Sequence, residues 1–343
     1  MRTFFKALAA LIFCGGSAMA ADAVSVGTVG NSSDAAFFIA YGKGYWKAEG
    51  LDVSFVPFDT SARMIAPLGR GDLDVGAGTA NAALYNAAGR DIAIKIVADR
   101  SRTEPGSRFQ VLTIRKELID SGAVKSLADL KGKKIALVTT GGSQDATLNE
   151  AAKKGGIKWE DIEKVYLAFP QQIAAFSNGA IDGSIMVEPF GSNAEKAGVA
   201  KIFLPTEDFI TNDQIGMVFF SEKFAKDRKD VGVRFMRGYI RALRDYNDAV
   251  DKEGRFSRGP KGQELVKLIA SQLNMKPEVI ADAFTQAIDP NGRVNEASMR
   301  RALDFFKYEG LISASNVAVE QILDNSFVES ALKDLGPYTP AKE

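Results

Sequence analysis

The chain has 343 residues, of which 46% are hydrophobic and 25% are charged, with 43 Lys and Arg against 43 Asp and Glu. These proportions are typical of a soluble globular protein and argue against a disordered chain, a collagen or a multi-span membrane protein. The balanced charge argues against nucleic-acid binding, which needs a basic surface. The chain has no histidine, which excludes Ser-His and Cys-His catalysis and histidine-ligated metals. We therefore expect no metal and no cofactor.

The first twenty residues have the pattern of a secretory signal peptide. Arg2 and Lys6 precede an apolar run from Ala7 to Phe13, and Ala18-Met19-Ala20 places small residues at both positions that a signal peptidase recognises. The run is well short of the roughly 18 residues that a spanning helix needs, so a membrane anchor is the weaker interpretation. Cleavage after Ala20 would remove Cys14, the single cysteine, and leave a thiol-free chain in the periplasm.

Strand and helix patterns alternate along the rest of the chain, which indicates an α/β fold with parallel sheets. The first series has strands at 24–29, 51–57, 73–77 and 92–98, and helices at 34–45, 61–68 and 80–88. The second series has strands at 110–114, 134–138, 165–168, 181–187 and 200–204, and helices at 127–130, 143–154 and 171–176. A strand at 215–220 and helices near 233–250, 262–273, 277–285, 296–308 and 317–323 follow.

The two series share a local pattern. GRGDLDVGAG around Asp74 and SNGAIDGSIM around Asp182 both contain the end of a helix, a glycine, an acidic residue and a buried strand. Two similar α/β lobes explain this pattern economically, although the shared segment is short. Two domains are also the expected solution for a chain of this length.

Polar loops follow several of the predicted strands, at the ends where helices begin. In parallel α/β sheets these carboxyl ends hold the functional loops. Free N–H groups and the positive end of a helix favour an anion or a polar oxygen there, although plain N-capping would use the same residues. We expect a shared ligand cleft whose candidate contacts are Asn31, Ser32, Ser33, Thr79, Asn81, Arg102, Thr140, Gly142, Ser143, Gln144, Glu188 and Phe190.

Several of these candidates have two interpretations. Glu188 could accept hydrogen bonds from a ligand amine, or it could cap the helix that Pro189 begins. Phe190 could stack on a ligand or pack in the core. Either Arg100 or Arg102 could face the cleft as a counter-charge, although a solvated surface arginine is the simpler expectation. TTGGSQ at 139–144 lacks the lysine and spacing of a P-loop, so we expect no nucleotide.

Four strings, taken in order, resemble one family. AYGKGYWKAEGLDVSFVP, LGRGDLDVGAG, SLADLKGKKIAL and SNGAIDGSIMVEPF are similar to segments of the periplasmic binding proteins of nitrate/sulfonate/taurine ABC importers, a family that also includes binders of thiamine-precursor pyrimidines. The resemblance implies a two-lobed periplasmic binding protein fold (type II-like) with two hinge crossovers, near 103–108 and 209–215. Lobe one would then comprise residues 22–105 plus 216–343, and lobe two residues 106–215.

The resemblance also implies a function. We expect a monomeric extracytoplasmic solute-binding protein that delivers a small organic anion or zwitterion, such as a sulfonate, carboxylate or nitrate-like ion, to a membrane ABC permease. A neutral pyrimidine or other heterocycle is the alternative ligand, and a sensor that signals to a membrane receptor is an alternative role. Family members that make pyrimidine use histidine and a cysteine cluster, which the mature chain lacks. An exported enzyme with Glu188 as base is therefore the weaker alternative, and we expect no enzyme.

Overall fold

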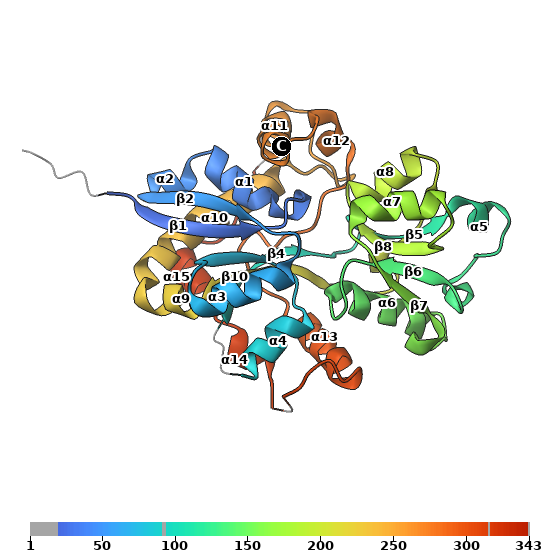
Figure 1. Cartoon of the computed structure of the whole chain (residues 1–343). Helices are drawn as coiled ribbons and strands as arrows, with labels where there is room; N and C mark the ends of the chain where they lie inside the picture. The colour runs from blue at the N-terminus through green and yellow to red at the C-terminus, as the bar shows by residue number, and fades with distance from the viewer. Residues whose placement is uncertain (1–19, 91–93, 315, 342–343) are drawn as a thin grey trace, which may run out of the picture.

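The computed structural model describes residues 20–90, 94–314 and 316–341. It contains two sheets, each flanked by helices, that lie side by side (Figure 1). The predicted signal peptide, apart from Ala20, and positions 92 and 93 of the strand predicted at 92–98 lie outside the described residues. Among the residues described, no helix has both the length and the apolar character that crossing a membrane requires.

The first sheet has the order β2-β1-β3-β10-β4. β1 pairs in parallel with β2 and β3, whereas β10 runs antiparallel to β3 and β4. Its strands are β1 (Asp22–Thr28), β2 (Leu51–Pro57), β3 (Val75–Gly78), β4 (Ile94–Arg102) and β10 (Gln214–Ser221). The helices that alternate with them are η1 (Ser32–Asp34), α1 (Ala35–Gly42), α2 (Tyr45–Ala48), η2 (Ser61–Met64), α3 (Ile65–Arg70) and α4 (Ala82–Ala88).

The second sheet has the order β7-β6-β8-β5-β9. β6 pairs in parallel with β7 and β8, whereas β5 runs antiparallel to β8 and β9. Its strands are β5 (Gln110–Arg115), β6 (Lys134–Leu137), β7 (Glu163–Tyr166), β8 (Gly183–Val187) and β9 (Ala200–Pro205). Its helices are α5 (Lys116–Asp120), η3 (Leu127–Leu130), α6 (Ser143–Lys154), η4 (Trp159–Asp161), α7 (Phe169–Ser177), α8 (Phe190–Lys196) and η5 (Thr206–Asp208).

Each sheet therefore contains one reversed strand beside four that run the same way, so the expectation of mainly parallel sheets is confirmed. The chain crosses between the sheets twice, from β4 to β5 and from β9 to β10. β5 and β10 are the first strands after these crossovers, and each enters its sheet from the side of the other sheet. β5 and β10 therefore run antiparallel to their neighbours. The neighbouring strands follow helices that carry the chain back to the opposite end of the sheet, which keeps those strands parallel to one another.

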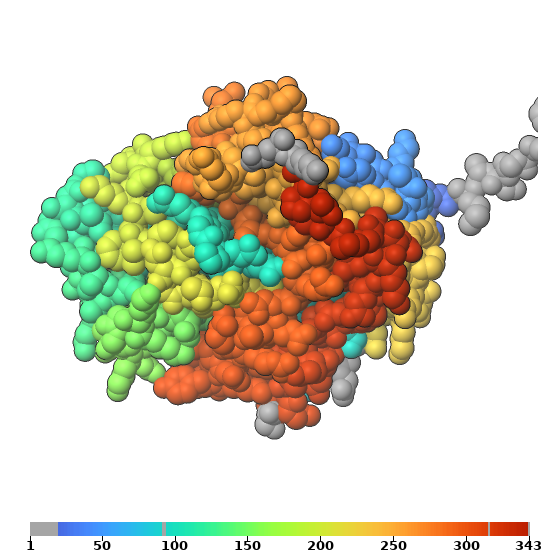
Figure 2. Space-filling model, turned by 180° about the vertical axis from the view of Figure 1, so that it is seen from behind, coloured from blue at the N-terminus to red at the C-terminus, as the bar shows by residue number. Residues whose placement is uncertain are grey.

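The C-terminal part of the chain is helical and belongs mainly to the first sheet. Figure 2 shows these segments, orange to red, over much of the rear face. α10 packs against α1, α2 and α15, and Trp46 stacks on Phe235 with ring centroids 4.7 Å apart in a fully buried aromatic cluster. The helices are α9 (Glu222–Asp227), α10 (Lys229–Ala249), α11 (Pro260–Leu273), α12 (Pro277–Asp282), α13 (Glu296–Tyr308), α14 (Val319–Ile322) and α15 (Ser326–Leu335). We call the first sheet with its helices the first lobe, and the second sheet with its helices the second lobe.

The two similar sequence segments occupy equivalent places in the two sheets. Asp74 precedes β3, and its Oδ2 accepts a hydrogen bond from the backbone N–H of Ser25 in β1 at 2.9 Å. Asp182 precedes β8, and its Oδ2 accepts one from the backbone N–H of Lys134 in β6 at 3.0 Å. In each lobe the aspartate ties the central strand to its parallel neighbour, because it accepts from a backbone N–H at the end of the sheet that has no partner residue in the central strand.

Candidate functional site

A cavity of about 300 Å³ lies between the lobes, at the carboxyl ends of the parallel strands. The first lobe contributes residues 29–31, 33, 59–61, 78, 79, 100 and 215, and the second lobe contributes residues 110, 138, 139, 142–144, 168–170, 187 and 190. Loops after β1, β2 and β3 therefore face the equivalent loops after β6, β7 and β8. Crevices outside the carboxyl ends of α/β strands are the usual ligand sites of such folds.

The wall from the first lobe is mostly polar. It presents Asn31, Ser33, Thr60, Ser61 and Thr79. Asn31 also caps η1, because its Oδ1 accepts a hydrogen bond from the backbone N–H of Ser33 at 3.0 Å. Hydroxyl and amide groups of this kind can donate to the oxygen atoms of a bound solute.

Arg100 is the one basic side chain in this wall, and it is paired with Asp34. Arg100 Nη2 lies 2.8 Å from Asp34 Oδ1, and the two side chains are only 3% and 0% exposed. Asp34 Oδ2 in turn accepts hydrogen bonds from the backbone N–H groups of Val29 and Gly30 at 3.1 and 3.0 Å. The expectation of a solvated surface arginine is wrong for Arg100, since the aspartate holds its charge inside the cavity wall.

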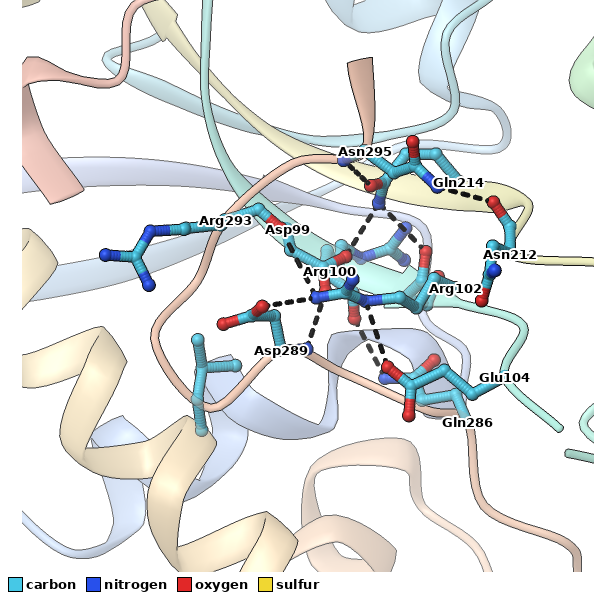
Figure 3. Close-up of polar contacts among 12 residues, drawn as sticks. Asp99, Arg100, Arg102, Glu104, Asn212, Gln214, Gln286, Asp289, Arg293 and Asn295 are labelled. Carbon is cyan, nitrogen blue, oxygen red and sulfur yellow. Dashed lines mark hydrogen bonds and ion pairs between the residues drawn. The ribbon is translucent and has the colours of Figure 1, made fainter. Parts of the chain in front are cut away.

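Arg102 lies elsewhere, at the point where the chain leaves β4 for the second lobe (Figure 3). Its Nε is 3.0 Å from Asp99 Oδ2 and its Nη2 is 2.8 Å from Asp289 Oδ2. Gln214, the first residue of β10, donates from Nε2 to Asp99 Oδ1 at 2.6 Å. Burial raises the pKa of Asp99 to about 6. Arg102 therefore holds the base of a crossover and does not line the cavity, contrary to the expectation of a ligand contact.

The N-terminus of α6 supplies polar groups from the second lobe. Gly142, Ser143 and Gln144 all line the cavity. The Gln144 side chain is held by backbone on both sides: Oε1 accepts from Val138 N at 2.8 Å, and Nε2 donates to Ile185 O at 2.6 Å. The free N–H groups of this first helical turn can meet a partial or full negative charge on a solute.

Glu188 is fully buried and is absent from the cavity wall. Its carboxylate accepts hydrogen bonds from the Ser192 hydroxyl at 2.8 Å and from the Ser192 backbone N–H at 3.3 Å, and burial raises its pKa. These contacts place the carboxylate at the start of α8. Of the two interpretations of Glu188, the structure favours the helix cap over the amine contact.

Two hydrogen bonds join the lobes beside the cavity. Ser32 Oγ donates to the backbone oxygen of Glu188 at 2.7 Å, and Ala82 N donates to the backbone oxygen of Gly141 at 2.8 Å. They lie in loops that also line the cavity, so the lobes meet around it. The described arrangement is therefore that of lobes closed on each other.

Seven of the twelve candidate contacts line the cavity: Asn31, Ser33, Thr79, Gly142, Ser143, Gln144 and Phe190. Five do not: Ser32, which joins the lobes; Asn81, which caps α4 through Leu84 N at 2.9 Å; Arg102; Thr140; and Glu188. The ligand roles of the seven remain predictions.

The sequence reasoning missed several further lining residues, among them Asp59, Thr60, Ser61, Gln110, Thr139, Phe169 and Pro170. Phe169 stacks on Phe190 with ring centroids 4.9 Å apart and an interplanar angle of 22°. Thr60, Ser61, Phe169 and Pro170 follow β2 and β7, so the rule that selected the other strand-end loops could have found them. Gln110 is the first residue of the reversed strand β5. A rule that selects loops after the ends of strands therefore does not select it.

Within residues 20–90, 94–314 and 316–341, no three Asp, Glu, His or Cys side chains form a group that could hold a metal ion.

Comparisons with known proteins agree with this geometry. The taurine-binding periplasmic protein of Escherichia coli (strain K12) is 26% identical over 301 residues, which cover 82% of this chain and 86% of that protein. The periplasmic nitrate-binding protein NrtA from Synechocystis PCC 6803 superposes with a TM-score of 0.74 at 14% identity, covering 92% of this chain and 89% of that one. The alkanesulfonate-binding protein SsuA from Xanthomonas axonopodis pv. citri, bound to MOPS, gives 0.67 at 18% identity, covering 89% and 98%.

The fold also occurs in an enzyme. The desulfurization enzyme DSZB superposes with a TM-score of 0.63 at 14% identity, covering 92% of this chain and 99% of that one. Similarity to solved structures at such low sequence identity shows a shared fold only. The expected two-lobed binding-protein fold is confirmed. Residues 31–249, more than half of the chain, match the family described as NMT1/THI5 like, and the chain therefore belongs to the NMT1/THI5-like family.

Proposed function

We propose that this chain is an extracytoplasmic solute-binding protein that captures a small organic anion or zwitterion between its lobes and delivers it to an ABC permease. The observation that carries the proposal is the cavity between the lobes, to which both lobes contribute polar groups and apolar side chains. The relatives named for binding taurine, nitrate and alkanesulfonate support the same class of ligand.

Closure of the lobes would supply part of the binding free energy. A ligand that contacts both walls favours the closed state over the open one by its differential affinity. The Ser32–Glu188 and Ala82–Gly141 hydrogen bonds would form only when the lobes meet. We take lobe one as residues 22–105 plus 216–343 and lobe two as residues 106–215, with the crossovers as hinges.

The chemistry of the lining residues supports release of the solute unchanged. The chain has no histidine, and the Glu188 carboxylate is turned into the start of α8. Asp59 is the lining carboxylate, and its side chain is 85% exposed, so it lacks the burial that would adapt it as a general base. We propose a periplasmic, monomeric carrier with a cleaved signal peptide, in line with the relatives named periplasmic.

Thermal unfolding against a ligand panel tests the proposal. The panel comprises taurine, alkanesulfonates, nitrate, aromatic carboxylates and pyrimidines. A ligand at a hundred times its dissociation constant adds about 2.7 kcal/mol to the unfolding free energy, which raises Tm by several degrees. Small-angle scattering with the ligand that stabilises most should give a smaller radius of gyration.

Two variants make the result specific to the cavity. Phe190→Ala should lose most of the stabilisation by ligand, whereas Tyr308→Ala, at a 76% exposed position on α13 away from the cavity, should keep it. An unchanged Tm with every compound would contradict the proposed ligand classes. An unchanged radius of gyration with a saturating ligand would contradict the closure mechanism.

A further inference from the structure

The two cavity walls differ in chemistry, and the difference restricts the solute. The first lobe supplies hydroxyl groups, Asn31 and the paired Arg100. The second lobe supplies the apolar side chains of Val138, Phe169, Pro170, Val187 and Phe190 beside the polar groups at the start of α6. A small ion bound to the polar wall alone would leave the apolar wall facing water, which is unfavourable in proportion to the area left uncovered.

The stacked rings form the centre of the apolar wall. Phe169 and Phe190 are each only partly buried and pack on a cluster that contains Phe109, Val187 and Ile215. Their rings are near parallel, at 22°, so each covers one face of the other and the flat surface left for a solute is on their outer sides. A planar ring of a solute can cover such a surface in an offset stack, which a short alkyl chain does less completely.

Gln110 supplies a polar group beside this apolar wall. It is 2% exposed, lines the cavity and pairs in register with Val187. Its side-chain oxygen Oε1 has no hydrogen-bond partner among the described residues. Gln144 and Gln172 differ in this respect, because both side-chain atoms of each are bonded within the lobe. A buried carbonyl oxygen without a donor is unfavourable, so a solute that donates to it gains affinity.

We infer that the solute carries a flat ring and a hydrogen-bond donor such as a hydroxyl group, and that Gln110 is the residue that recognises this donor. The inference rests on the proposed function and restricts its ligand class. Nitrate, which has neither a ring nor a donor, would leave both the stacked rings and Gln110 unoccupied. Taurine would supply a donor without a ring.

Four sulfonates separate the two requirements. Benzenesulfonate and 4-hydroxybenzenesulfonate carry the ring, and ethanesulfonate and 2-hydroxyethanesulfonate do not; the second member of each pair adds the hydroxyl. Isothermal titration calorimetry with the purified protein should give tighter binding of both ring compounds than of both alkyl compounds. The hydroxyl should tighten binding of the ring compound by about tenfold.

Three variants assign the effects to residues. In Gln110→Leu the hydroxyl preference should disappear while the ring preference remains. In Phe190→Leu the ring preference should fall while the hydroxyl preference remains. Gln172→Leu removes a buried amide of the same lobe outside the cavity and should keep both preferences. Circular dichroism of each variant confirms that it is folded.

The outcomes distinguish this inference from the proposed function. Equal binding of all four sulfonates, or a hydroxyl preference that survives in Gln110→Leu, would overturn the inference and leave solute binding intact. Tighter binding of the alkyl sulfonates would do the same. Failure of all four to bind the wild-type protein would overturn the inference, and the proposed ligand class would fall only if every other compound of the panel also failed to bind.

Discussion

One backbone arrangement occurs twice around the cavity, once in each lobe. Gly30-Asn31-Ser32-Ser33-Asp34-Ala35 follows β1, and Gly141-Gly142-Ser143-Gln144-Asp145-Ala146 follows β6. The first glycine of each has a left-handed backbone, with φ of 65° and 70°. Its N–H donates to Oδ2 of the aspartate four residues later, at 3.0 Å in the first lobe and 2.6 Å in the second.

The two aspartates differ in their partners. Asp34 is paired with Arg100, whereas Asp145 Oδ1 accepts a hydrogen bond from the Tyr166 hydroxyl at 3.4 Å. Burial raises the pKa of Asp145 to about 7. The same loop conformation is thus stabilised by a buried ion pair in one lobe and by a carboxyl that is partly protonated near neutral pH in the other. The backbone conformation of the loop therefore does not determine whether its aspartate has a cationic partner. A residue distant in the sequence, Arg100, supplies that partner in the first lobe.

Breaking the ion pair should have the largest effect. Arg100→Met leaves the Asp34 carboxylate buried without its cation, which costs on the order of 3–5 kcal/mol of unfolding free energy. Urea unfolding at pH 7 measures the loss. The double variant Arg100→Met with Asp34→Asn should recover much of it, because no buried charge is then left alone. A loss below about 1 kcal/mol in the single variant would show that the pair contributes little to the fold.

Removing the second aspartate should change the pH dependence of stability. The unfolded Asp145 carboxyl ionises near pH 4, whereas in the folded protein it holds its proton up to about pH 7. Ionisation therefore stabilises the unfolded state as pH rises through this window, and the folded protein loses up to about 4 kcal/mol. Asp145→Asn should gain stability over the wild type between pH 4 and 7 and keep that gain above pH 7.

Unfolding in urea at pH 5, 6, 7 and 8 tests this difference. Burial also raises the pKa values of Asp99 and Asp213, so Asp145→Asn should remove only part of the slope. Glu160→Gln, which removes an exposed carboxylate of the same lobe, controls for the change in net charge. A stability difference between Asp145→Asn and the wild type that stays constant with pH would contradict the assignment.

The sequence allowed much of the fold to be predicted, because periodicity and strand-end loops are local signals. The strand predicted at 51–57 and the helix predicted at 143–154 coincide with β2 and α6. The reversed directions of β5 and β10 were not predictable from local patterns, since they depend on which sheet the chain enters. The same limit applies to the two arginines of β4.

Arg100 and Arg102 lie two residues apart, and strand periodicity alone gives them equivalent positions. Their ion-pair partners distinguish them. Arg100 pairs with Asp34, whereas Arg102 pairs with Asp99 and Asp289. Asp34 and Asp289 come from distant segments, so no spacing rule could assign one arginine to the cavity and the other to the hinge. The role of Glu188, by contrast, had a local indication, because Ser192 lies only four residues ahead.

Substituting the first glycine of each loop, Gly30 or Gly141, should have the smallest effect on stability, and it distinguishes the two lobes most clearly. Gly30→Ala and Gly141→Ala each force a side chain into a left-handed conformation, at a cost of about 1–2 kcal/mol. A Cβ at Gly30 would meet nothing within 4 Å, whereas a Cβ at Gly141 would lie 2.9 Å from the Cβ of Ala82 in the other lobe, at the lobe contact beside the cavity. Gly141→Ala should therefore weaken ligand binding more than Gly30→Ala, because it keeps the lobes apart.

Calorimetric titration of both variants with the ligand that stabilises the wild type most measures this difference. Gly30→Ala should weaken binding less than Gly141→Ala, since its new methyl group would meet no residue of the other lobe. Gly141→Ala should bind several-fold more weakly, because the Ala82–Gly141 hydrogen bond of 2.8 Å could not form without displacing the new methyl group. Equal affinities of the two variants would mean that the solute binds without this contact between the lobes. The two loops would then be equivalent in their effect on ligand binding as well as in their backbone conformation.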